Sequence, residues 1–358
     1  NKLIFEFSKN KTDGDSSLNN LLGGKGANLA EMSNMEIPVP PGFTITTEVC
    51  NYFTENKNLP NSLDNEIRQA VSKLENLSDK CFGGEGTPLL LSVRSGGRVS
   101  MPGMMDSILN IGLNDSNVSQ LAEAFNDERF ALDSYRRLIQ MYSNVVLGVE
   151  HERFEAVLAN KKRMDNVVSD ADFNVDQLNW IINAYKNTVE RFTDSLFPQE
   201  PYEQLTGAIE AVFNSWQNKR AATYRKINNI PDSWGTGATI QTMVFGNLND
   251  KSGTGVAFTR NPSNGDKELY GEYLINAQGE DVVAGIRTPH PITKHSKVEQ
   301  ESLESKFPKA YKELLEISTK LENHFKEAQD IEFTIENGVI YLLQTRTAKR
   351  TAQASVKI

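Results

Sequence analysis

The stretch from Gln329 to Arg346 reads QDIEFTIENGVIYLLQTR and decides the fold of the C-terminal part of the chain. In it, Ile331, Phe333 and Ile335 alternate with polar residues, which predicts a strand with one apolar and one polar face. The chain then turns at Asn337-Gly338 and continues into a second, mostly apolar run. We therefore expect a β-hairpin with one face in a hydrophobic core.

The loop that joins the two strands determines which side chains share a face. A two-residue turn at Asn337-Gly338 would send Gln344 to the apolar face. A three-residue loop over 336–338, with a left-handed glycine in a bulge, would instead pair Asp330 with Gln344 and place Glu332 beside them. We expect the three-residue loop.

The polar face of this hairpin has the composition of a magnesium and phosphate site. Mg²⁺ prefers oxygen ligands and keeps several waters, so one or two carboxylates, an amide oxygen and phosphate oxygens suit it. We predict Asp330, Glu332 and Gln344 as metal ligands, with Arg346 as a cation for phosphate oxygens. The plainer alternative is a solvated hairpin edge, because a sheet usually turns its polar face to water.

Composition limits the classes of protein that the chain can belong to. Its 358 residues, 38% of them hydrophobic, are enough for two or three globular units. A net charge of -9 argues against nucleic-acid binding, and no apolar run is long enough to span a membrane. The isolated cysteines Cys50 and Cys81 favour reduced thiols in a cytoplasmic protein. Because the chain begins at Asn1 without Met, we expect a fragment of a longer protein.

The organisation predicts an α/β (α+β) fold with a helical insertion. Residues 1–114 mix glycine-rich turns with short apolar runs, whereas 115–199 have almost no Gly or Pro and show helical spacing. Residues 200–246 should continue the first lobe, 247–349 form a second lobe and 350–358 begin a linker. The expected helices cover residues 27–35, 130–146, 175–192 and 202–227, and the expected strands cover 88–94, 240–245, 255–259 and 269–275.

Two glycine-bearing segments contain cations that suit phosphate. Gly23-Gly24-Lys25-Gly26 precedes a predicted helix, so amide groups and an ammonium would lie at a helix N-terminus, where anions bind. A glycine turn with a solvated lysine explains this pattern equally well, and it is not a Walker P-loop. The loop SVRSGGR, followed by SMPGMMD, carries Arg94 and Arg98, and Gly103 lets it lie close to a ligand. An exposed basic turn is the alternative.

Two further segments are weaker candidates. Gln241, Met243 and Val244 could offer backbone groups and apolar side chains to an adenine ring, although a core strand is the more ordinary explanation. Thr254 and Gly255 lie where a glycine-rich stretch leads into a small apolar strand. We include them among the candidate nucleotide contacts, and a simple hairpin would also explain them.

Several of these motifs together resemble one family. The segments GGKGANLAEM, SVRSGGRVSMPGMMDSILNIGLND, QTMVFGN, SGTGVAFTRNP, GEYLINAQGEDVVAGIRTPHPI and DIEFTIENGVIYLLQTR occur in that order and resemble the ATP-binding domain of the pyruvate phosphate dikinase family. The resemblance spans essentially the whole chain. It implies an ATP-grasp-like fold in which two α/β lobes clamp ATP.

The resemblance also implies roles for particular residues. Lys25, Arg94 and Arg346 resemble the cations that bind and act on the polyphosphate, and Glu332 and Gln344, with Asp330 beside them, resemble the Mg²⁺ set. We expect Glu280, next to Asp281, near the ribose or the free phosphate, with a capped turn as the alternative. The chain departs from the expected pattern at Gly97 and Val99, which adjoin the arginine loop.

The family's reaction converts ATP, phosphate and pyruvate into AMP, diphosphate and phosphoenolpyruvate through a phosphohistidine on a separate domain. None of the four histidines has the Thr-Ser-His context of that carrier. We therefore expect the chain to bind MgATP without completing the reaction, as part of a homodimeric full-length enzyme. The alternatives are a phosphoenolpyruvate synthase-type domain and a non-catalytic module that senses ATP.

Overall fold

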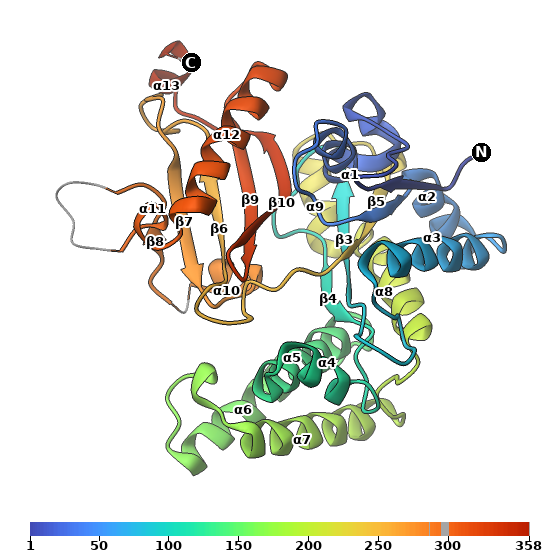
Figure 1. The fold of residues 1–358 in the computed structure, drawn as a ribbon. Helices are drawn as coiled ribbons and strands as arrows, with labels where there is room; N and C mark the ends of the chain where they lie inside the picture. Colours follow the sequence, from blue (N-terminus) through green and yellow to red (C-terminus); the bar gives the residue numbers. More distant parts are fainter. Residues whose placement is uncertain (286, 295–300, 358) are drawn as a thin grey trace. The chain divides into compact units, whose positions relative to one another are not determined.

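The computed structural model describes residues 1–285, 287–294 and 301–357, and it divides into two compact units (Figure 1). Both units combine a five-stranded sheet with helices, as the sequence predicts. The units interleave along the chain. Unit 1 comprises Asn1–Glu6, Asn20–Gly26 and Pro41–Met243, and unit 2 comprises Phe7–Asn19, Ala27–Pro40 and Val244–Ile358.

Unit 1 is built on a sheet with the strand order β1-β2-β5-β3-β4. The pairs β2/β5, β5/β3 and β3/β4 are antiparallel. Helix α2 packs on β5, and α8 packs on β3, β4 and β5. The strands are β1 (Ile4–Phe7), β2 (Gly42–Ile45), β3 (Leu91–Gly97), β4 (Ser107–Ile111) and β5 (Thr236–Thr242); the helices around them are α2 (Thr47–Asn56), α3 (Leu63–Ser78), α8 (Pro201–Ser215), α9 (Lys219–Ile227) and the 3₁₀ turn η3 (Asp232–Trp234).

The segment from α8 to α9 corrects one sequence-based expectation. We expected one helix over residues 202–227, but the structure has two. The break occurs because Asn218 caps the second helix, where its side chain accepts a hydrogen bond from the amide of Ala221 at 2.7 Å.

A group of helices occupies the segment where the sequence predicts only helices. It contains α4 (Val118–Phe125), α5 (Glu128–Val145), α6 (His151–Asp165), η2 (Asp170–Asp172) and α7 (Val175–Thr193). Helix α5 packs against α4, α6 and α7 and also against β4, so it joins the group to the sheet of unit 1.

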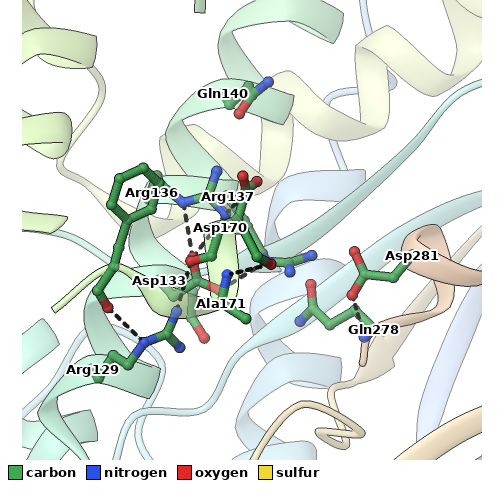
Figure 2. A network of polar contacts seen from close by, with 12 residues as sticks. Arg129, Asp133, Arg136, Arg137, Gln140, Asp170, Ala171, Gln278 and Asp281 are labelled. Carbon is green, nitrogen blue, oxygen red and sulfur yellow. Dashed lines mark hydrogen bonds and ion pairs between the residues drawn. The ribbon is translucent and has the colours of Figure 1, made fainter. Parts of the chain in front are cut away.

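A buried ionic network holds this helical group together (Figure 2). Asp133 on α5 is buried, and its carboxylate lies 2.8 Å from Arg136 and 3.0 Å from Arg137. Burial alone would raise the pKa of Asp133, but Arg136, Arg137 and Arg129 outweigh it and hold that pKa below its usual range. Arg129 also donates to the backbone carbonyls of Asp170 and Phe173 at 2.9 and 2.8 Å, and so ties α5 to η2.

Unit 2 is built on a fully antiparallel sheet with the strand order β10-β9-β6-β7-β8. Helix α12 packs on β9 and β10. The strands are β6 (Gly253–Phe258), β7 (Tyr270–Ile275), β8 (His290–Pro291), β9 (Gln329–Glu336) and β10 (Val339–Thr347); the helices are η1 (Ser16–Leu18), α10 (Gly279–Ala284), α11 (Leu303–Lys306), α12 (Pro308–Phe325) and α13 (Ala352–Lys357). Helix α1 (Asn19–Asn34) is shared, because Asn20–Gly26 belongs to unit 1 and the rest of the helix to unit 2.

The core of unit 2 explains why two early segments belong to it. Leu29, Met32 and Ile37 are buried in one cluster with Ile331 and Phe333 of β9. Our sequence-based division placed all of residues 1–114 in the first lobe. The structure instead assigns Phe7–Asn19 and Ala27–Pro40 to unit 2, because their apolar side chains are buried in its core.

The hairpin turn differs from the expected one. Glu336 pairs with Val339, so the turn has two residues, Asn337 and Gly338. Both have positive φ, 49° and 85°, as a type I′ turn requires. The predicted three-residue loop and its pairing of Asp330 with Gln344 are therefore wrong.

A bulge further along the hairpin places the polar side chains on one face of the sheet, as we predicted. The register shifts between Leu342 and Gln344, which makes Leu343 the extra residue. Beyond the bulge, Gln344 pairs with Glu332 and Arg346 pairs with Asp330. The four polar groups therefore share one face, although by a different route from the one we expected.

Replacing Gly338 with alanine tests the two-residue turn. A Cβ at Gly338 would meet nothing within 4 Å, so the cost is that of a positive φ alone, about 1–2 kcal/mol of unfolding free energy. Urea unfolding should show this loss. Gly279→Ala is the matched control, because a Cβ there also meets nothing within 4 Å and its φ lies outside the positive range. Equal stabilities of the two variants would contradict the assigned turn.

Two other sequence-based expectations concern cysteines and membranes. Cys50 is buried, Cys81 is partly exposed and both are free thiols. Burial raises the pKa of the Cys50 thiol to about 11, which makes it an inert core group. In the described part of the chain, no helix combines the length and apolar character needed to cross a membrane.

Candidate functional site

Three glycines bring Lys25 against strand β3 in unit 1. Helix α1 is interrupted at Gly23, whose φ of 71° and ψ of 167° are not helical. A Cβ at Gly23 would lie 1.8 Å from the carbonyl oxygen of Gly96, and a Cβ at Gly96 would lie 3.0 Å from Cβ of Lys25. A Cβ at Gly237 would lie 2.6 Å from the carbonyl oxygen of Leu22. The backbones can approach this closely only because all three residues are glycine.

Arg94 lies on the same face of that sheet. Thr44, Thr239 and Arg94 occupy one row across β2, β5 and β3. A Cβ at Gly26, the residue after Lys25, would lie 2.7 Å from Oγ1 of Thr44, so the resumed helix covers this face. The structure therefore places the ammonium-bearing turn and the arginine strand, which we selected separately from the sequence, on one side of the sheet of unit 1.

Two of the residues that we expect to contact adenine already form hydrogen bonds within unit 1. Gln241 is buried, and its side-chain oxygen accepts a hydrogen bond from Nη2 of Arg94 at 3.2 Å. The amide of Met243 donates to the carbonyl of Leu90 at 2.9 Å. That amide therefore already has a protein partner, and Gln241 acts in the structure by positioning Arg94. Val244 begins the last segment of unit 2.

Gly103 lies in the loop between β3 and β4. Its φ is 71°, and a Cβ there would meet nothing within 4 Å, so the backbone conformation rather than close packing favours glycine. The loop is anchored nearby, because Asn218 donates to the carbonyl of Met104 at 3.0 Å. Burial raises the pKa of Asp106 in the same loop, although Arg220 acts to lower it.

In unit 2, Asp330 and Arg346 form the best-defined pair of the candidate site. Nε of Arg346 lies 2.7 Å from Oδ2 of Asp330, and the arginine side chain is 41% exposed whereas the aspartate side chain is 13% exposed. Glu332 and Gln344 form the next cross-strand pair on this face, and both are partly exposed. Two carboxylates, an amide and a guanidinium thus lie side by side, and their polar ends are within reach of a ligand.

The same row of the sheet holds a carboxylate that sequence reasoning missed. Glu332 pairs with Val256 on β6, and Val256 pairs with Glu272 on β7. Glu272 therefore shares a face with Glu332 and Gln344, and it is exposed. Its alternation with the buried Tyr273 was visible in the sequence, but the order of the strands was not.

Thr254 and Gly255 serve the packing of this sheet. Oγ1 of Thr254 donates to the carbonyl of Phe333 at 3.1 Å, and the side chain is buried. A Cβ at Gly255 would lie 2.5 Å from the carbonyl oxygen of Glu272 and 2.7 Å from the Phe333 ring. Packing within the sheet explains why these two positions hold threonine and glycine. Their contact with a nucleotide stays a prediction.

The segment with Glu280 forms the short helix α10. Asp281 accepts a hydrogen bond from the amide of Gln278 at 2.9 Å, which caps the helix (Figure 2). The capped turn that we weighed as the alternative is present. Glu280 is partly exposed on the same turn.

The oxygen atoms on this face of unit 2 suit a cation that takes its remaining ligands from water and phosphate. Among the residues described, no group of three or more His, Cys, Asp or Glu could hold a metal by itself. Asp330, Glu332 and Gln344 offer two carboxylates and an amide, the partial oxygen set that Mg²⁺ completes with water and phosphate oxygens.

The chain is similar to known proteins over its whole length. The family model described as "Pyruvate phosphate dikinase, AMP/ATP-binding domain" matches residues 19–82, 56–312 and 293–358. The chain is 53% identical over 360 residues to pyruvate, phosphate dikinase of Rickettsia prowazekii and 51% identical over 359 residues to that of Clostridium symbiosum. It is 48% identical over 358 residues to the chloroplastic enzyme of Mesembryanthemum crystallinum.

These matches cover all of this chain but less than half of each relative. The chain spans 40% of the length of the two bacterial proteins and 37% of the length of the plant protein. The similarity therefore concerns one part of a longer enzyme.

Proposed function

Because the chain belongs to the pyruvate phosphate dikinase AMP/ATP-binding domain family, we propose that it binds ATP together with Mg²⁺ and acts on the polyphosphate. The observation that carries this proposal is the row of Asp330, Glu332, Gln344 and Arg346 on one face of β9 and β10. The fold, mixed helix and sheet with two antiparallel sheets, is the expected ATP-grasp type.

The roles of the residues follow from their charges. Lys25 and Arg94 on unit 1 and Arg346 on unit 2 supply cations for phosphate oxygens, and Asp330, Glu332 and Gln344 are the proposed metal ligands. Bound Mg²⁺ would neutralise charge on the phosphates and orient them. Arg346 is held by Asp330, so its guanidinium is pre-positioned rather than ordered by the ligand.

We further propose that the ATP-binding chain serves the reaction named for its relatives. Transfer of the βγ-pyrophosphoryl group to a histidine on another domain of the full-length protein would spread charge over the phosphate oxygens. Such a step needs placed cations rather than a nucleophile from this chain. Loss of one cation from the transition state would cost about 3–4 kcal/mol, by analogy with loss of an oxyanion-hole donor. Phosphate and pyruvate remain the proposed partners of the full-length enzyme.

Titration calorimetry with MgATP tests the proposal. Arg346→Ala should weaken binding about ten- to a hundredfold, because a charged, bidentate contact contributes roughly 1.5–3 kcal/mol. Glu332→Gln should reduce the dependence of affinity on Mg²⁺ concentration, since a carboxylate ligand is lost.

The matched control is Arg350→Ala, which removes the same charge from the same end of unit 2. Arg350 lies beyond β10 and pairs with Glu327 instead of with the acidic face. The Arg350→Ala variant should bind MgATP with the affinity of the unaltered chain. Equal weakening by both arginine substitutions would show a non-specific charge effect, and unchanged affinity in Arg346→Ala would remove Arg346 from the ATP site.

A further inference from the structure

Asn218 links the start of helix α9 to the loop between β3 and β4. Its side-chain oxygen accepts a hydrogen bond from the amide of Ala221 at 2.7 Å, and its side-chain nitrogen donates to the carbonyl of Met104 at 3.0 Å. The side-chain amide therefore gives its acceptor to the helix and its donor to the loop. All three residues belong to unit 1.

The helix cap alone does not explain why this position holds asparagine. An N-cap needs only an acceptor for an amide of the first helical turn, and aspartate and serine supply one about as well as asparagine does. An ionised aspartate has no donor, and serine is shorter. The bond to Met104 is therefore the contact that distinguishes Asn218 from the other good caps.

The part of the loop that Asn218 holds is a tight turn at residues 101–104. The amide of Met104 donates to the carbonyl of Met101 at 3.2 Å. Pro102 and Gly103 occupy the two central positions, and φ of Gly103 is 71°. This is the pattern of a type II turn, in which proline fixes φ of the first central residue and glycine supplies the positive φ of the second.

The two ends of this turn are held, whereas its tip is open to solvent. Met101 is buried, and the carbonyl of Met104 is bonded to Asn218. Pro102 and Gly103 are exposed. A ligand can therefore reach the tip of the turn while the protein holds its base.

A second contact attaches the loop to the end of helix α8. The amide of Asp106 donates to Oγ of Ser215 at 3.4 Å, and Ser215 is buried as the last residue of α8. This contact is longer than the one from Asn218, so the bond of Asn218 to Met104 is the stronger attachment. The loop follows β3, which carries Arg94, and these two attachments fix the turn relative to that strand.

We propose that Asn218 is a positioning residue for the polyphosphate, because it holds the turn so that Gly103 is in place before the nucleotide binds. Gly103 is one of our predicted nucleotide contacts, and with no side chain there a phosphate oxygen can approach the backbone closely. A loop that is already held loses less conformational freedom on binding, which increases affinity. This inference rests on the proposed binding of MgATP.

Hydrogen exchange of the chain without nucleotide tests the anchor itself. Asn218→Asp keeps an oxygen for the amide of Ala221 but loses the donor to Met104. Exchange of the backbone amides in residues 98–106 should become about three- to tenfold faster, since one neutral hydrogen bond is lost. Exchange in α9 and the urea midpoint of unfolding should stay those of the unaltered chain. Unchanged exchange in the loop would overturn the anchor.

Titration calorimetry tests the positioning role. Asn218→Asp should bind MgATP about three- to tenfold more weakly, because the loop must now be ordered by the ligand. Its affinity for AMP, which has no β- or γ-phosphate, should not change. Asn218→Ser also keeps the cap and adds no charge, so it should weaken MgATP binding by a similar factor. Weakening by Asn218→Asp alone would indicate repulsion between the new carboxylate and the phosphates, and would overturn the inference.

Asn174→Ala is the matched control for loss of a helix cap. Asn174 caps α7, where its side chain accepts a hydrogen bond from the amide of Gln177 at 2.9 Å. Asn174→Ala should lower the urea midpoint and leave MgATP affinity unchanged. Equal weakening of MgATP and AMP binding by Asn218→Asp, or weakening of MgATP binding by Asn174→Ala, would show a merely structural effect and overturn the inference.

The same titrations separate this inference from the proposed function. If the unaltered chain does not bind MgATP, the proposed function fails and the positioning role fails with it. If the unaltered chain binds MgATP and both Asn218 variants bind it equally well, only the positioning role fails.

Discussion

Gly23→Ala should destabilise the chain by about 3 kcal/mol or more. A positive φ costs an L-residue about 1–2 kcal/mol, and the new Cβ would lie 1.8 Å from the carbonyl oxygen of Gly96, which adds the cost of overpacking, roughly 1–3 kcal/mol. The contact is with backbone, so no side-chain rotation can relieve it. Urea unfolding followed by circular dichroism would measure the loss.

Gly103→Ala is the matched control for this prediction. Gly103 has the same φ of 71°, but a Cβ there meets nothing within 4 Å. It should therefore show the backbone cost alone, about 1–2 kcal/mol. The difference between the variants isolates the close approach of the two backbones, and no difference would show that Gly23 and Gly96 are not in contact in solution. The same close approach positions Lys25, so Gly23→Ala should also weaken MgATP binding if the proposed site is right.

Arg136→Met should destabilise unit 1 by about 3–5 kcal/mol, because it leaves the buried carboxylate of Asp133 without its nearest cation (Figure 2). Thermal or urea unfolding would detect this loss at neutral pH. Arg163→Met, on an exposed part of α6, is the control, and should stay within about 0.5 kcal/mol of the unaltered chain. An equally small loss in Arg136→Met would contradict the described network.

The stability that the same network contributes depends on pH. The pKa of Asp133 is lowered in the folded chain, so its stabilisation is present above the unfolded value of about 3.9 and is lost as pH falls through the folded value. Arg136→Met should raise the folded pKa. The stability difference between this variant and the unaltered chain should therefore be largest near neutral pH and shrink in acid.

Local patterns in the sequence predicted much of the fold and the types of site residue. The alternation of Ile331, Phe333 and Ile335 with polar residues required a two-faced strand, and all three apolar side chains are fully buried. The segment poor in glycine and proline around residues 115–199 required helices, and α4 to α7 are there. These features depend on the periods of 2.0 and 3.6 residues, which are local properties of the chain.

Register and helix continuity were less accessible from the sequence. A one-residue bulge at Leu343, rather than a longer turn, brings Gln344 opposite Glu332. The bulge and the longer turn both keep the apolar face of the hairpin buried up to the turn. The alternation of apolar and polar residues therefore could not distinguish between them. Similarly, the cap at Asn218 that separates α8 from α9 competes with an otherwise continuous helical pattern.

The sequence by itself determined which residue types the chain offers: cations beside glycines, acids on the polar face of one strand with an amide and an arginine on the next, and the motifs that identify its family. Tertiary structure alone decided which of these groups meet. Lys25 and Arg94 share a side of one sheet only because the chain folds back through Gly23, Gly96 and Gly237. Glu272 joins the row of Glu332 only because β6 lies between their strands. Local periodicity fixes the face on which a side chain lies, but its neighbours depend on long-range packing that no short stretch of sequence contains.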